Sequence, residues 1–105
     1  MPVESDTSWL QYVKYQSDEL CLRAVALNGL HLEHVRFQTP LICHTAVKQN
    51  GLALQFVLSY AKTRDLCIEA IRQNPLAIRF TKEANISDLA AIIRAVPEAK
   101  HYLNT

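Results

Sequence analysis

Apolar residues recur along this chain at the spacing of one face of an α-helix. Leu66, Cys67, Ala70 and Ile71 occupy positions i, i+1, i+4 and i+5, which lie on the same side of a helix. Two earlier segments repeat this arrangement, at Leu20, Cys21, Ala24 and Val25 and at Ile42, Cys43, Ala46 and Val47. The pattern predicts three helices that each contribute an apolar face to one core.

The three segments belong to an internal repeat. The phrases AVALNGLHLEHV, AVKQNGLALQFV and AIRQNPLAIRFT begin at Ala24, at Ala46 and at Ala70, with steps of 22 and 24 residues. Each phrase contains an asparagine followed by glycine or proline, namely Asn28-Gly29, Asn50-Gly51 and Asn74-Pro75. Periods of this length are typical of stacked helical repeats. Each unit is therefore predicted to be a longer helix, a tight turn and a shorter helix.

The repeat continues weakly toward both ends of the chain. One apolar position recurs two residues before an aromatic-like position, and its occupants are Leu10, Leu32, Leu54, Ile78 and finally Lys100. The sequence thus predicts a single domain over residues 1–105. It comprises a half unit at 8–14, units at 17–37, 39–60 and 63–81, and a degenerate capping unit at 86–104.

Helix boundaries are marked by residues with known capping preferences. Thr39 before Pro40, Ser17 before two acids, and Ser87-Asp88 are expected to begin helices, because their side chains cap free backbone N–H groups. Gly51 is expected to end a helix in the left-handed conformation, where a residue without a Cβ meets no penalty. The segment LALQFV would then turn back and pack.

These observations predict an all-α fold, a short α-solenoid of helix-turn-helix repeats with a 22–24 residue period. Leucine-rich repeats also have periods in this range, and LHLEHV could form a strand. Their alternating leucines precede the asparagine, however, whereas here they follow it. The helical alternative is therefore favoured.

Composition narrows the class of protein. The net charge of +1 and the absence of a long apolar run argue against a global attraction to nucleic acid and against a membrane span. The first residues lack the pattern of a secretory signal. Three cysteines cannot all pair within the chain, which favours a reducing compartment. We therefore expect a soluble, cytoplasmic protein, with delivery into a host cell still compatible with the sequence.

The phrases AVKQNGLALQFV and LCIEAIRQNPLAIRF resemble the repeat known as domain of unknown function 4116. The resemblance is strong over about residues 17–81 and weaker at both ends. It implies a tandem helical protein of the kind found in bacteria, including host-associated ones, and in large viruses. It implies no reaction and no catalytic residues. Ala26-Leu27 depart from the usual Lys-Gln pair, and the last unit lacks Asn-Gly.

Residues with catalytic or metal-binding chemistry do not form a recognisable motif. Cys21, Cys43 and Cys67 lie 22 and 24 residues apart, so they form no CxxC pair and are expected in the core. His31 and His34 are three residues apart on a short predicted helix, a spacing that can bind zinc. His34 and His44, however, hold the positions of packing residues in the other units, and the packing interpretation is favoured. No catalytic, cofactor or metal site is predicted. An enzyme remains an alternative only if His34, His44 and the cysteines converge in space.

The candidate partner-binding residues are a basic row and two bulky apolar residues. Lys48, Arg72 and Arg94 hold equivalent positions, so stacking would align them. Glu69, three residues before Arg72, is expected to neutralise part of this charge. Trp9 and Phe37 are large where their counterparts are small or polar, as in interaction hot spots.

The sequence thus favours a non-catalytic interaction module that binds a protein partner or a second copy of itself. A bacterial or viral protein that contacts a host protein would fit this class. Nucleic-acid binding through the Lys/Arg row is the alternative, although no aromatic residues are interleaved with it.

Overall fold

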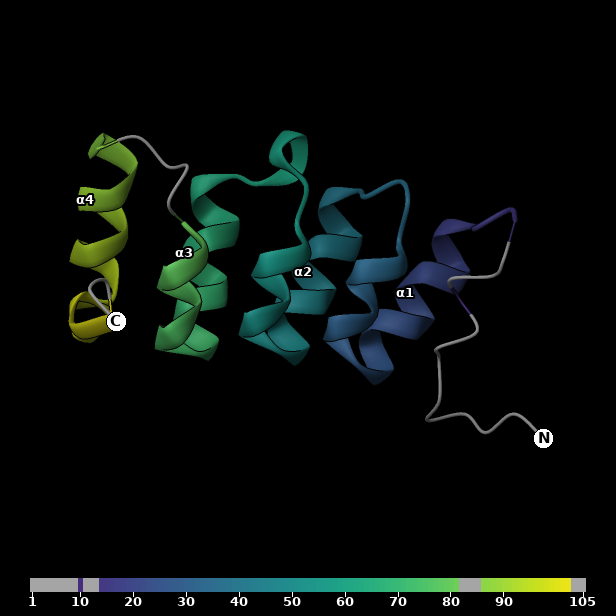
Figure 1. Ribbon diagram of the computed structural model, residues 1–105, viewed down its shortest axis with the longest axis horizontal. Helices are drawn as coiled ribbons and strands as arrows, with labels where there is room; N and C mark the ends of the chain where they lie inside the picture. Colours follow the sequence, from purple (N-terminus) through teal and green to yellow (C-terminus); the bar gives the residue numbers. More distant parts are fainter. Residues whose placement is uncertain (1–9, 11–13, 82–85, 103–105) are drawn as a thin grey trace.

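The structure, a computed structural model, describes residues 10, 14–81 and 86–102. These residues form helices joined by short linkers, and they contain no strand (Figure 1). The all-helical prediction is therefore confirmed. Four α-helices of ten residues each are α1 (Asp18–Leu27), α2 (Pro40–Gln49), α3 (Arg64–Gln73) and α4 (Ile86–Ala95). Six-residue 3₁₀-helices follow them, namely η2 (Gly29–His34), η3 (Gly51–Phe56), η5 (Pro75–Phe80) and η6 (Pro97–Tyr102).

The first turns of the α-helices are capped by hydroxyl side chains. Thr39 Oγ1 accepts a hydrogen bond of 3.3 Å from the N–H of Ile42, with Pro40 in the first turn. Ser17 Oγ likewise accepts from the N–H of Leu20 at 3.1 Å. These two predicted caps are confirmed, because capping depends on residues only three positions apart. The third is wrong, since α4 already begins at Ile86 and includes the Ser87-Asp88 pair.

Each of the first three α-helices ends at an asparagine in an extended conformation. Asn50 has φ −153° and ψ 111°, and its N–H still donates to the carbonyl of Ala46 at 2.9 Å. Its side chain accepts from the N–H of Leu52 at 2.9 Å, so Asn50 also caps η3. The predicted left-handed cap at Gly51 is wrong, because no described residue has a positive φ.

The two glycines instead permit close contact with the following α-helix. A Cβ built on Gly51 would lie 2.3 Å from the carbonyl oxygen of Ala70 in α3. A Cβ on Gly29 would lie 2.2 Å from the carbonyl oxygen of Ala46 in α2. No side chain fits at such distances. Glycine at these positions thus serves packing between successive helix pairs.

The helices follow one another along the long axis of a molecule that measures 45 × 23 × 19 Å (Figure 1). The α-helices contact one another in chain order, from α1 through α4, and the six-residue 3₁₀-helices do the same. The core lies between these two rows. Its fully buried side chains include Leu32, Ile42, Leu54, Ile71, Ile78 and Ile92.

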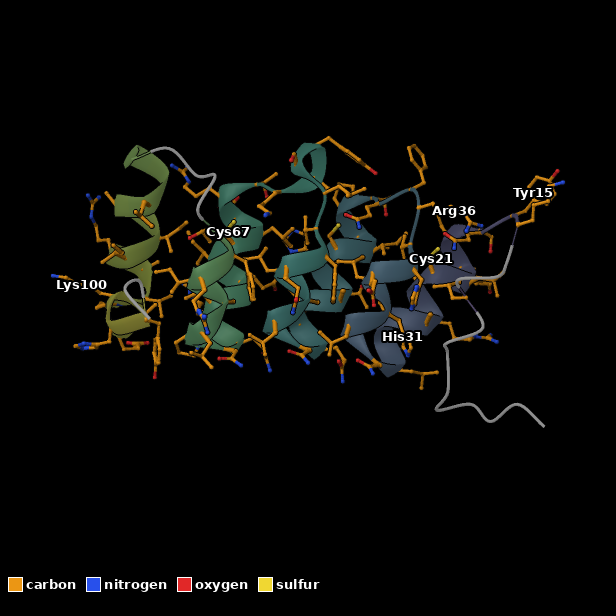
Figure 2. All side chains as sticks on the ribbon, in the orientation of Figure 1. Tyr15, Cys21, His31, Arg36, Cys67 and Lys100 are labelled. Carbon is orange, nitrogen blue, oxygen red and sulfur yellow. The ribbon has the colours of Figure 1, made fainter. Side chains whose placement is uncertain are left out.

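One position changes character at the C-terminal end. Leu10, Leu32, Leu54 and Ile78 are at most 1% exposed. Lys100, which holds the equivalent position in η6, is exposed at the outer end of the molecule (Figure 2). The outer side of η6 therefore carries a charge, while Ala99 of the same helix is buried in the core.

Candidate functional site

The side chains of two glutamines link successive helix pairs. Gln49 Oε1 accepts a hydrogen bond of 2.6 Å from the N–H of Gly29, and Gln73 Oε1 accepts one of 2.5 Å from Gly51. In the next pair the donor position is Pro75, which has no N–H, and the acceptor position is Ala95. In each of these three cases, the backbone N–H donor and the glutamine acceptor are therefore either both present or both absent.

A second set of hydrogen bonds joins the segment that precedes one α-helix to the linker that precedes the next. Gln38 is 5% exposed, donates to the carbonyl of Phe56 and accepts from the N–H of Leu58, both at 2.8 Å. Gln16 makes the corresponding bonds to the His34 carbonyl at 2.7 Å and the Arg36 N–H at 2.9 Å. These glutamines satisfy backbone groups where the chain leaves a 3₁₀-helix.

The cysteines are placed for packing. Cys21, Cys43 and Cys67 are free thiols with exposures of 2%, 0% and 3%, which confirms the predicted core position. Cys43 Sγ lies 3.7 Å from Gln38 Oε1. Burial raises the pKa of Cys43 from 9.0 to about 11 and also raises the pKa of Cys21. A thiol with a raised pKa is a poor nucleophile near neutral pH.

The histidines lie at separate places. The rings of His31 and His34 are 6.0 Å apart on η2, and His34 Nε2 is 3.8 Å from Glu33. His44 lies on α2 and its Nδ1 contacts Glu69 Oε1 of α3. Within the described part of the chain, no three His, Cys, Asp or Glu side chains are grouped to hold a metal ion.

The predicted basic row lies at the C-terminal turns of three successive α-helices. Lys48, Arg72 and Arg94 are all exposed. The expected pairing of Glu69 with Arg72 is wrong, because Glu69 reaches across to His44 and lies 3.9 Å from Lys48 Nζ. Arg72 and Arg94 make no ion pair with any other described side chain.

Exposed apolar side chains gather near the linkers that precede the α-helices. Phe37 is 75% exposed, while Trp9 lies outside the described residues. The structure adds Leu41 and Tyr60, both 62% exposed, which the sequence comparison did not single out. Tyr15 is 80% exposed and projects from the end of the molecule near α1 (Figure 2).

A cavity of about 120 Å³ lies between α2 and α3, beside the linker that joins η3 to α3. This linker contains the short 3₁₀-helix η4 (Ser59–Ala61), and Tyr60 Oη accepts a hydrogen bond of 2.8 Å from the N–H of Gln38. The cavity walls include Pro40, His44, Tyr60, Ala61, Thr63 and Leu66.

The longer of the two steps in the sequence corresponds to the linker that forms a wall of this cavity. Residues 57–63 connect η3 to α3, whereas only residues 35–39 connect η2 to α2. The two additional residues produce the step of 24 in place of 22. They allow η4 to fold back over Gln38 and so create a wall that the preceding linker lacks.

Comparisons with known proteins support the family resemblance for the centre of the chain. Residues 41–84 match the family model described as a domain of unknown function (DUF4116). This segment contains almost all of α2, together with η3, α3 and η5. The chain matches none of the curated proteins and none of the solved structures with which it was compared.

No described helix has both the length and the apolar character needed to cross a membrane.

Proposed function

We propose that this chain is a short helical solenoid that acts as a non-catalytic module for binding an acidic protein partner. The observation that carries the proposal is the exposure of Lys48, Arg72 and Arg94 at equivalent places on α2, α3 and α4. A row of cations on successive helices suits a partner with several carboxylates, because each added pair reinforces the same orientation.

The proposed solenoid is supported by the match between sequence period and structural elements. Each step of 22 or 24 residues corresponds to one α-helix and one six-residue 3₁₀-helix, and the α-helices contact their neighbours in chain order. Proteins built in this way present extended surfaces for binding. Phe37 would supply a separate apolar contact at the opposite end of α2 from Lys48, because its side chain is 75% exposed.

The chemistry of the buried thiols also favours binding over catalysis. Cys43 is fully buried and burial raises its pKa to about 11, so little thiolate is present at neutral pH. His44 contacts Glu69 on the surface between α2 and α3, while Cys43 points into the core. Cys43 and His44, although adjacent in the chain, thus lie in the core and at the surface respectively.

The test is a tagged pull-down from nuclease-treated lysate, read by mass spectrometry. Wild type is compared with the triple variant Lys48→Glu, Arg72→Glu, Arg94→Glu. The matched control carries Arg23→Glu, Arg79→Glu and Lys100→Glu, which reverse three exposed charges outside the row. Circular dichroism verifies that all three proteins fold.

The proposal predicts a protein partner that the wild type and the control retain and the row variant loses. Retention by all three proteins would contradict a role for the row. Recovery of the chain alone would indicate self-association, and capture only without nuclease treatment would indicate nucleic-acid binding.

A further inference from the structure

The cavity and the basic row share one face of the α2–α3 pair. His44 lines the cavity and precedes Lys48 by four residues, which places both on the same side of α2. Glu69 of α3 contacts His44 and lies 3.9 Å from Lys48 Nζ. Arg72 follows Glu69 by three residues and is exposed. The face therefore has a hollow at one end and two cations at the other.

The hollow is suited to an apolar side chain. Pro40, Ala61 and Leu66 contribute carbon surface to its walls, and Tyr60 contributes its ring. Several polar groups of the walls already have partners, because Tyr60 Oη accepts from the Gln38 N–H and Thr63 Oγ1 accepts from the Leu66 N–H at 3.2 Å. With those groups engaged, the interior suits an apolar group better than a polar one.

The size of the hollow limits the class of side chain. Its volume is about 120 Å³, somewhat smaller than the engineered cavity of about 150 Å³ that binds benzene. A leucine, isoleucine or valine side chain is the natural match. Tyr60, which lines the cavity and is 62% exposed, extends the apolar contact beyond the opening.

The surrounding charge favours an acidic occupant. Beyond His44, toward the C-terminal ends of α2 and α3, the face carries the cations Lys48 and Arg72. Two carboxylates lie along this side of α3, namely Asp65 in its first turn and Glu69, which is shared between His44 and Lys48. A partner carboxylate that reached the end of the face beyond His44 would therefore meet two cations, Lys48 and Arg72, and one carboxylate, Glu69.

We propose that the α2–α3 face binds an acidic peptide segment, which inserts one aliphatic side chain into the cavity and places a carboxylate against Lys48 and Arg72. This inference rests on the proposed function and specifies its partner. A helix rises about 1.5 Å per residue, so Lys48 lies about 6 Å beyond His44 along α2. An extended peptide spans this length in two residues, at about 3.3 Å each.

The direct test uses fluorescein-labelled peptides and the full chain. Each peptide carries two adjacent glutamates and one leucine, and the series varies their separation from one to six residues. Fluorescence anisotropy at low salt should show tightest binding at a separation of two to four residues. Replacing leucine by glutamine, or both glutamates by glutamine, should weaken binding at least tenfold. A series in which no peptide binds would overturn the proposal.

Two matched variants locate the binding site. Ala61→Leu adds three carbon atoms to a wall of the cavity, whereas Ala26→Leu adds the same atoms to an exposed position on α1. Ala61→Leu should weaken the best peptide at least tenfold, and Ala26→Leu should leave its affinity within twofold. Equal affinities for the two variants would overturn the proposal.

The same variants separate this inference from the proposed function. If Ala61→Leu retains a cellular partner that the row variant loses, the basic row is a binding surface and the cavity is not used. If the row variant also retains the partner, the proposed function itself fails.

Discussion

Gln73 Oε1 accepts a hydrogen bond of 2.5 Å from the backbone N–H of Gly51, so the end of α3 is tied to the start of η3. Gly51 is buried, and its N–H is directed at the following helix pair. Gln49 and Gly29 repeat the same relationship one step earlier, at 2.6 Å. Neighbouring helix pairs are therefore held in register by directed bonds as well as by apolar contact.

Gln73→Ala should destabilise the fold by about 1–3 kcal/mol, because it leaves the buried N–H of Gly51 without an acceptor. Urea denaturation followed by circular dichroism measures this change. Gln55→Ala is the control, since Gln55 is exposed and bonds only to Leu52 within η3. Equal stability of the two variants would show that the link contributes nothing.

Gly51→Val should cost about 3 kcal/mol or more, because the added carbon atoms collide with the carbonyl oxygen of Ala70. That is a large share of the stability of a small domain. Thermal melting tests this, with Gln55→Val as a control in the same 3₁₀-helix. A melting temperature within a degree of wild type would contradict the close approach of Gly51 to the carbonyl oxygen of Ala70.

Cys43 should resist alkylation in the folded protein, because it is fully buried and its pKa is raised to about 11. At pH 8 only about one thiol in a thousand would be ionised. Iodoacetamide labelling followed by mass spectrometry should modify Cys43 in guanidinium chloride and spare it in buffer. Rapid labelling in buffer would show that the core opens readily.

The same thiol predicts a loss of stability at alkaline pH. The folded pKa of Cys43, about 11, exceeds the ordinary value of 9.0, so the unfolded chain releases this proton first. The contribution of the neutral thiol is complete below pH 9 and is lost as the pH rises through 11. Cys43→Ala should reduce this alkaline dependence, as measured by urea titrations between pH 8 and pH 11.

The glutamine link should not transfer to η5 and α4, because α4 packs against α3 and η6 and has little contact with η5. Pro75→Gly supplies an N–H, and Ala95→Gln supplies an acceptor at the position equivalent to Gln73. A double-mutant cycle should therefore show additive effects of the two changes, within about 0.5 kcal/mol. A favourable coupling of about 1 kcal/mol would contradict this expectation and would mean that α4 approaches η5 as α3 approaches η3.

Local features of the fold could be predicted because they depend on nearby residues. The Thr39 cap is set by a bond to Ile42, three residues later, and the burial of Cys43 follows from the helical period. Gly51 was assigned the wrong role, because glycine suits both a left-handed turn and a close contact. The repeated glutamine that faces it would have identified the contact.

The candidate site was less predictable, because it depends on how neighbouring helices are rotated. Glu69 was expected beside Arg72 on its own helix, yet it contacts His44 of α2. The period of the sequence gives each helix a buried face but does not determine which side chains meet across two helices. The cavity follows from a two-residue difference in linker length, whose effect depends on the path of η4.

Lys100 bears on how copies of this chain could associate. Adding a further helix pair, or a second copy stacked head to tail, against η6 would cover an ammonium group where Leu32 and Leu54 are buried. Burial of an unpaired charge is costly, so open-ended growth of filaments from this end is disfavoured. A closed, two-fold arrangement through another surface would leave this ammonium group in solvent.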